Sequence, residues 1–324
     1  MRKTALVLFL AVFFASFILV GCGPQEGDPQ SYRIGIVQHA VHDALDDARE
    51  GFIEALAEEG FVEGENIVID IQNAQGEITT ASTIAEGFVA DGVDLILAIA
   101  TPSAQATYNV TKEIPIVITA VTDPVVAGLA DSLEIPGANV TGTHDMNPIG
   151  EQIDLLQEIF PEATNVGVIF NSSEENSLVQ VELLEEKAAR EGLNIVKAPI
   201  TATGEVSTAA ESLVGKVDVI YIPTDNTVVE AITSVIAVSE DHRIPVIPGE
   251  ESCIDKGSLA TVGINYFKLG YQTGKMAAKI LRGEAEPATM PIEGQSEYRV
   301  VINTDAAEKL GVELPQSVIE RAED

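Results

Sequence analysis

Short runs of apolar and β-branched residues alternate with amphipathic segments of helical period along the whole chain. The runs predict strands at residues 33–37, 67–71, 95–98 and 116–119 in the first half, and at 166–170, 194–198, 219–222 and 246–248 in the second. The amphipathic segments predict helices at 43–59, 80–91, 149–159 and 178–191. This alternation is typical of βαβ units, so we predict an α/β fold with parallel sheets.

The two halves of the chain repeat the same order of elements. Ile-Gly-Ile-Val at 34–37 corresponds to Val-Gly-Val-Ile at 166–169, and a helical segment and a strand follow each of them. A repeat of about 130 residues is too long for a solenoid and predicts two similar doubly wound lobes. Because ligands of open parallel sheets bind beyond the carboxyl ends of the strands, we expect a cleft there, between the lobes.

The beginning of the chain has the order of a bacterial lipoprotein signal. Arg2 and Lys3 precede an apolar run over 4–20, which closes on Gly21 and Cys22. A run of about 17 apolar residues is also the lower limit for a membrane span, but the Gly-Cys pair favours cleavage before Cys22. We therefore expect a signal peptide at 1–21, a lipid on Cys22 and a flexible tether at 22–31, which place the protein outside the cytoplasm, anchored to a membrane.

Composition narrows the possible partners. The chain has 51 acidic and 18 basic residues and a net charge of −33, which makes binding to nucleic acid or to anionic lipid improbable. The acidic residues are spread along the helical segments, as on a strongly solvated surface. With Cys22 lipidated, Cys253 has no partner within the chain, and we interpret it as a small buried residue.

Hydroxyl, amide and carboxylate residues follow the expected strands, at or just before helix starts. Such residues commonly cap helices, and for each of them capping is an equal alternative. The functional interpretation is that hydroxyls at helix N-termini bind a carboxylate while an aspartate binds an ammonium group, as a zwitterionic amino acid requires. The hydroxyls assigned to the carboxylate are Thr101, Ser103, Ser172 and Ser173, and the aspartates assigned to the ammonium group are Asp123, Asp145 and Asp225.

Signatures of catalysis and of cofactor binding are missing from the sequence. It contains no nucleophile elbow, no phosphate-binding loop, and no dinucleotide-binding glycine motif after the first strand. His39 and His42 have a spacing that could pair on a metal, but no third ligand lies close in sequence, and His42 fits better as a polar group of the cleft. We expect no enzymatic activity, no cofactor and no metal.

Several segments, in order along nearly all of the chain after residue 31, resemble the substrate-binding lipoproteins of ABC transporters, in the family that includes the TrpX-type tryptophan-binding proteins. The segments are His-Asp-Ala-Leu-Asp at 42–46, Gly-Phe at 51–52, Ala-Thr-Pro-Ser-Ala-Gln at 100–105, Val-Thr-Asp-Pro at 121–124, Gly-Leu at 128–129, Asn-Val-Thr-Gly at 139–142, Asn-Ser-Ser-Glu at 171–174, Asn-Ser at 176–177, Ile-Pro-Thr-Asp-Asn-Thr at 222–227, Leu-Gly-Tyr-Gln-Thr-Gly at 269–274, and Ile-Asn at 302–303 followed by 306–311.

The resemblance implies the type I periplasmic-binding-protein fold, in which two lobes are joined by three hinge strands. The N-terminal lobe would comprise 32–142 and 266–298, and the C-terminal lobe 143–265 and 299–324. It also implies a monomer that binds an amino acid, aromatic or otherwise hydrophobic, and delivers it to an ABC permease. The implied ligand contacts are His42, Thr101, Ser103, Thr122, Asp123, Asp145, Asn171, Ser172, Ser173, Asn176, Asp225, Asn226 and Glu250.

Other functions remain open. The same fold could serve as a ligand-sensing module for a receptor, which differs only in its partner. It could also bind a sugar or a nucleoside, although sugar sites usually stack the ring on aromatic faces, and only 5% of this chain is aromatic, with no tryptophan. An enzyme is the least favoured alternative.

Overall fold

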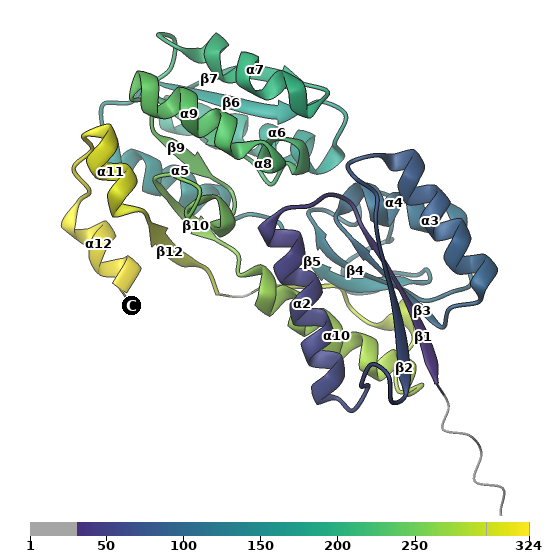
Figure 1. Cartoon of the computed structure of the whole chain (residues 1–324). Helices are drawn as coiled ribbons and strands as arrows, with labels where there is room; N and C mark the ends of the chain where they lie inside the picture. The colour runs from purple at the N-terminus through teal and green to yellow at the C-terminus, as the bar shows by residue number, and fades with distance from the viewer. Residues whose placement is uncertain (1–30, 296, 324) are drawn as a thin grey trace, which may run out of the picture. The chain divides into compact units, whose positions relative to one another are not determined.

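The computed structural model describes residues 31–295 and 297–323 (Figure 1). The predicted signal peptide, Cys22 and nearly all of the tether lie outside the described residues. Residues 32–324 form one compact unit. No helix among the described residues is long and apolar enough to cross a membrane.

The first lobe is built on a parallel sheet in the order β11-β5-β4-β3-β1-β2. Its hydrophobic cores show that α2 and α10 cover one face and that α3 lies on the other, beside α4. The strands are β1 (Tyr32–Gln38), β2 (Ile67–Asn73), β3 (Leu95–Ile99), β4 (Ile116–Val121), β5 (Val140–His144) and β11 (Glu293–Gly294), and the helices are α2 (Asp43–Glu58), α3 (Ile78–Asp91), α4 (Thr101–Val110), α10 (Tyr266–Leu281) and the short η3 (Pro287–Thr289).

The second lobe has a parallel sheet in the order β7-β6-β8-β9, and β10 and β12 form a separate antiparallel pair. Helices α5 and α6 share one core with the sheet, and α7 and α9 share another. The strands are β6 (Asn165–Asn171), β7 (Asn194–Ile200), β8 (Val219–Ile222), β9 (Val246–Pro248), β10 (Ala260–Gly263) and β12 (Arg299–Ile302), and the helices are α5 (Ile149–Ile159), α6 (Glu175–Glu191), η1 (Thr203–Glu205), α7 (Val206–Leu213), α8 (Asn226–Glu230), α9 (Ile232–His242), η2 (Glu251–Cys253), α11 (Thr304–Leu310) and α12 (Gln316–Glu323).

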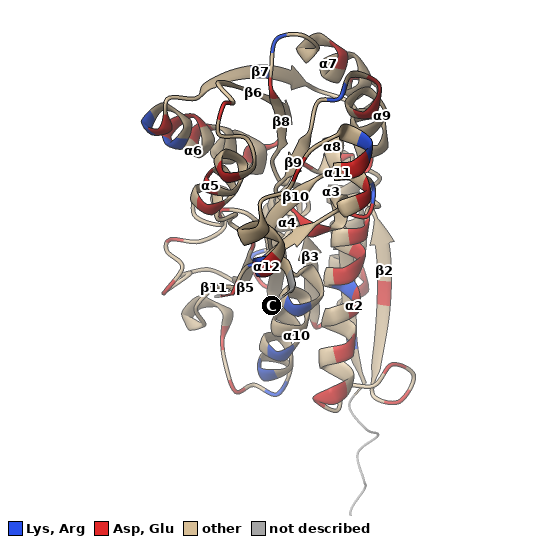
Figure 2. Cartoon of the chain, turned by 90° about the vertical axis from the view of Figure 1, so that its left-hand side faces the viewer, with Lys and Arg blue, Asp and Glu red and all other residues tan. Residues whose placement is uncertain are grey.

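The sequence predictions of α/β class and of eight strands and four helices are confirmed. The three strands expected at the hinge do not form one ladder, because β5 pairs with β4 and β11, whereas β10 pairs with β12. The chain passes between the sheets after β5, between β10 and α10, and between β11 and β12. Figure 2 shows acidic positions on helices of both lobes, among them α2, α5 and α9, which agrees with a solvated acidic surface.

Glycines allow α2 and α10 to pack with their backbones in contact. A Cβ at Gly270 would lie 1.8 Å from the carbonyl oxygen of Ala48, and one at Gly51 would lie 2.1 Å from the carbonyl oxygen of Phe267. Both obstacles are backbone atoms of the facing helix, which no side-chain rotation removes. This contact fixes α10, a segment far along the chain, on the first sheet.

Gly270→Ala should therefore destabilise the protein by about 1–3 kcal/mol, because the added methyl group forces the helices apart. Gly87→Ala is the matched control, since Gly87 lies in α3 and a Cβ there meets nothing within 4 Å. That substitution should stabilise by about 0.5–1 kcal/mol through helix propensity. Urea denaturation of both variants measures the difference, and equal effects would contradict the close packing.

Candidate functional site

Polar residues at the carboxyl ends of the strands of both lobes meet in a central cavity. Two contacts cross from one lobe to the other: His42 Nε2 lies 3.5 Å from Asn226 Oδ1, and the hydroxyls of Thr122 and Thr224 are 3.5 Å apart. The lining residues are His42, Leu45, Ala120, Thr122, Asp145, Asn176, Thr224, Asp225, Asn226, Glu250 and Tyr266. The structure thus brings together seven of the thirteen residues that the sequence analysis proposed as ligand contacts.

Asp145 is a buried carboxylate with one oxygen left unpaired. It follows β5 and is only 3% exposed. Its Oδ2 accepts a hydrogen bond of 2.7 Å from the Tyr266 hydroxyl, whereas Oδ1 has no hydrogen-bond partner among the described residues. Burial raises the pKa of Asp145, and the hydroxyls of Tyr266 and Thr122 oppose that shift. A buried carboxylate with free lone pairs is suited to bind a cation or a strong hydrogen-bond donor.

Glu250 supplies a second buried carboxylate to the same cavity. It is 2% exposed, accepts a hydrogen bond of 2.6 Å from the Ser252 hydroxyl and lies 3.9 Å from Nδ1 of His42. Burial raises the pKa of Glu250, and His42 opposes this shift. With Asp145, it gives the cavity an acidic character that favours a positively charged ligand group.

Asp225 lines the cavity but is occupied by contacts within its own lobe. Its Oδ1 accepts from the backbone N–H of Val228, which caps α8, and its Oδ2 accepts from Ser177 and from the backbone N–H of Asn171. Burial and the neighbouring Glu174 carboxylate raise the pKa of Asp225, while these hydrogen bonds oppose the shift. Here the capping alternative describes the residue, and the assignment to an ammonium group loses support.

Glu174 organises the loops around Asp225 and was not expected from the sequence. It is buried and accepts six hydrogen bonds. The donors are the side-chain amides of Asn171, Asn176 and Asn226, the backbone N–H groups of Asn226 and Thr227, and the hydroxyl of Thr227. The amides of three predicted ligand contacts are therefore held in place by this one carboxylate.

The N-terminus of α4 presents the predicted carboxylate-binding hydroxyls. Thr101 and Ser103 are both buried in its first turn. The Thr101 hydroxyl oxygen accepts from the backbone N–H of Thr122 at 3.4 Å, and Ser103 Oγ has no hydrogen-bond partner in the described part of the chain. A helix N-terminus with an unpaired buried hydroxyl favours an anion.

Three of the predicted contacts lie elsewhere. Asp123 is partly exposed, and its Oδ1 accepts from the backbone N–H groups of Val125 and Val126 at 3.0 Å, which is a capping contact. Ser172 is exposed and its hydroxyl donates to the carbonyl of Ile200. Ser173 is exposed and borders a second cavity.

This second cavity has a volume of about 280 Å³ and shares Asn226 with the central one. His39, the start of α3 and Pro102 border it from the first lobe, and Asn171, Ser173 and Glu174 from the second. His39 Nδ1 is buried without a hydrogen-bond partner among the described residues, and burial lowers the pKa of His39. The described residues contain no group of three His, Cys, Asp or Glu side chains that could hold a metal ion.

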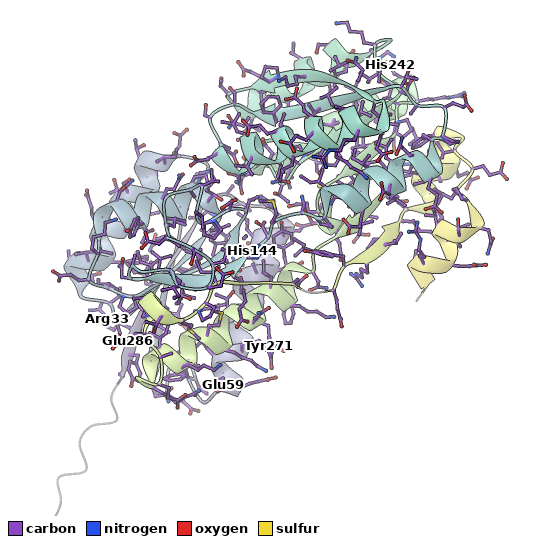
Figure 3. The ribbon with its side chains drawn as sticks, turned by 180° about the vertical axis from the view of Figure 1, so that it is seen from behind. Arg33, Glu59, His144, His242, Tyr271 and Glu286 are labelled. Atoms are coloured by element: carbon purple, nitrogen blue, oxygen red, sulfur yellow. The ribbon has the colours of Figure 1, made fainter. Side chains whose placement is uncertain are left out.

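Two other residues singled out by their chemistry lie away from the central cavity. His144, in β5 (Figure 3), packs against β11, where a Cβ at Gly294 would lie 2.5 Å from its Nε2. Cys253 is fully buried and raised in pKa by burial, which confirms its interpretation as a small buried residue.

Comparison with known proteins agrees with this geometry. Residues 33–324 match the family described as ABC transporter substrate binding protein. The chain belongs to this family. Its members bind solutes outside the cytoplasm and are not enzymes, and the predicted family resemblance is confirmed.

Individual relatives indicate more about this substrate-binding protein. It is 42% identical to the tyrosine-binding protein of Clostridioides difficile strain R20291 over 322 residues, which cover 96% of this chain and 93% of the relative. A Streptococcus pneumoniae ABC domain solved in complex with L-Trp is 35% identical, with a TM-score of 0.88 over 90% of this chain and 99% of the other. The ligand-free, open structure of a substrate-binding protein from Clostridium difficile is 48% identical, with a TM-score of 0.68 over 88% of this chain and 96% of the other.

Proposed function

We propose that this substrate-binding protein is anchored by a lipid on Cys22, binds an aromatic amino acid between its lobes and delivers it to the permease of an ABC importer. The observation that carries the choice of ligand is the buried Asp145 carboxylate, with an unpaired oxygen at the central cavity. Relatives named for tyrosine binding and solved with L-Trp support an aromatic side chain.

The two ends of the amino acid have separate partners in this proposal. Asp145 binds the ammonium group, with Glu250 adding to the negative potential. The first turn of α4, with Thr101 and Ser103, binds the carboxylate. The aromatic ring contacts Leu45 and Tyr266, the largest apolar faces of the central cavity.

Closure of the lobes over the ligand is supported by direct contacts between them. Gln105 in α4 donates a hydrogen bond of 2.6 Å to Glu175 in α6, and Lys256 lies 2.6 Å from Asp43 at the start of α2. The TM-score is also higher with the L-Trp complex than with the open structure, although the open structure is closer in sequence. We therefore assign the described conformation to the closed state.

The proposal keeps the lobe boundaries implied by the family resemblance, 32–142 with 266–298 and 143–265 with 299–324. The packing of α10 on α2, and of α12 beside β12 and α5, supports this division. In this proposal the protein is monomeric, and the closed form docks on the permease.

A thermal-shift screen of residues 31–324, which contain the whole described fold, tests the ligand class. Tyrosine, tryptophan or phenylalanine at about 100 times its dissociation constant should stabilise the protein by about 2.7 kcal/mol. Sugars and nucleosides should have no effect at the same concentration. A response to a sugar or a nucleoside, with none to any amino acid, would contradict the proposed ligand while leaving the fold intact.

A further inference from the structure

Two strained alanines end the strands that carry the first lobe's part of the site. Among the described residues, four non-glycine residues have positive φ: Gln75, Ala100, Ala120 and Arg243. Arg243, with φ 56° and ψ 45°, ends α9 in the ordinary left-handed conformation of a helix C-terminus. Ala100, with φ 78° and ψ 152°, occupies a region that is essentially restricted to glycine. Strain of this kind costs about 1–3 kcal/mol per residue and is concentrated at binding sites.

Ala100 joins β3 to α4 in a single residue. Its N–H donates to the carbonyl of Thr119 in β4 at 3.1 Å, and its own carbonyl accepts from Ala104 in α4 at 3.0 Å. The residue therefore still belongs to the sheet by its N–H while its carbonyl already belongs to the helix. The strained turn brings Thr101 and Ser103 directly to the end of the sheet, without an intervening loop.

Ala120 lies in an irregularity between β4 and β5. Ile118 pairs with Gly142, but Val121 pairs with His144, so β4 contains one extra residue between these pairs. Beyond the irregularity, the N–H of Asp145 donates to the carbonyl of Val121 at 3.2 Å. A β-bulge of this kind redirects the side chains that follow it. Here it places Thr122 next to Asp145, where both line the central cavity.

The surrounding protein holds both alanines in these conformations. Ala100 is 1% and Ala120 is 6% exposed, and both methyl groups belong to the core that α2 and α10 form on the first sheet. Neither alanine donates a side-chain hydrogen bond or carries a charge. Any effect they have on a ligand must pass through the backbone that they fix.

We infer that Ala100 and Ala120 are positioning residues, whose strained backbone pre-organises Thr101, Thr122 and Asp145 to receive the charged ends of the ligand. This role rests on the proposed function. A rigid site loses less conformational entropy on binding, so the strain is offset by the ligand contacts that it aligns. Glycine at either position relaxes the backbone and removes the alignment.

The test measures the dissociation constant for L-tyrosine and the thermal midpoint in Ala100→Gly and Ala120→Gly, using residues 31–324. We expect each dissociation constant to rise about tenfold, equivalent to about 1.4 kcal/mol. The thermal midpoint without ligand should stay the same or rise, because strain is released. Faster dissociation, rather than slower association, should account for most of the change.

Two control variants separate positioning from the loss of a methyl group and from the loss of strain elsewhere. Ala98→Gly removes a fully buried methyl group from β3 at a residue that lacks positive φ, and should lower the midpoint without changing affinity. Arg243→Gly changes a positive-φ residue at the end of α9, and should leave affinity unchanged.

Dissociation constants within twofold of wild type in both alanine variants would overturn the inference while leaving the proposed function standing. If Ala98→Gly weakened binding as much as Ala100→Gly, the effect would come from core packing, and the positioning role would again be rejected. If the wild-type protein bound none of the aromatic amino acids, the proposed function would fail and the positioning role with it.

Discussion

Asp145→Asn is expected to weaken binding of an aromatic amino acid by about 100-fold or more. The substitution keeps the size of the side chain and can keep a hydrogen bond with Tyr266, but removes the charge that binds the ammonium group. Removing one partner of a buried, hydrogen-bonded charge pair costs about 2–5 kcal/mol. Isothermal titration of L-tyrosine into the variant and the wild-type protein measures the loss.

Asp123→Asn is the matched comparison, because the same chemical change is made at another aspartate that the sequence had assigned to the ammonium group. Asp123 caps a turn outside the central cavity, so its substitution should change affinity by less than about threefold, which is within about 0.6 kcal/mol. The account of the site would be wrong if Asp123→Asn weakened binding more than Asp145→Asn.

Glu174→Ala is expected to destabilise the protein by about 3 kcal/mol or more. Glu174 accepts six hydrogen bonds, and its removal leaves the buried backbone N–H groups of Asn226 and Thr227 without their acceptor. Each unsatisfied buried donor costs about 1–3 kcal/mol. The free energy of unfolding, measured with urea in the absence of ligand, gives the effect.

The neighbouring Glu175 provides the control. It is partly exposed, and its described hydrogen bond is to Gln105 in the other lobe. Glu175→Ala should change the free energy of unfolding by no more than about 0.5 kcal/mol, the usual range for a surface position. Similar losses in both variants would show that the network around Glu174 is not what stabilises these loops.

Much of the fold could be predicted because its signals are local. The strands are buried β-branched runs, and the helices have one apolar face, so their periods identify them without knowledge of their neighbours. The repeat between 34–37 and 166–169 then predicts two lobes, and the rule on strand ends predicts where the polar residues meet. These steps correctly brought His42, Thr122, Asp145 and Glu250 to one cavity.

The roles of individual polar residues could not be predicted in the same way. Asp123, Asp145 and Asp225 are the same residue type in the same kind of position, after a strand. What separates them is burial and hydrogen bonding: Asp123 and Asp225 have caps to make, whereas Asp145 keeps an unpaired oxygen. Those contacts come from backbone groups and loops that the sequence pattern does not place.

The residues that the sequence analysis missed depend on contacts between distant segments. Tyr266 reaches Asp145 only because α10, 121 residues further along the chain, packs on the first sheet. Thr224 meets Thr122 across the cleft, and Gln180 donates hydrogen bonds to both of these threonine hydroxyls. Glu174 was quoted as part of a motif, but its six hydrogen bonds depend on α8, which has only five residues.

The most direct test of the central claim is a calorimetric titration of residues 31–324 with L-tyrosine and with N-acetyl-L-tyrosine. Acetylation keeps the ring and the carboxylate but removes the positive charge from the amino group. The account predicts saturable binding of one L-tyrosine per chain and no measurable binding of the acetylated form. Equal affinity for the two compounds would contradict the pairing of the ammonium group with Asp145, on which the proposed site is built.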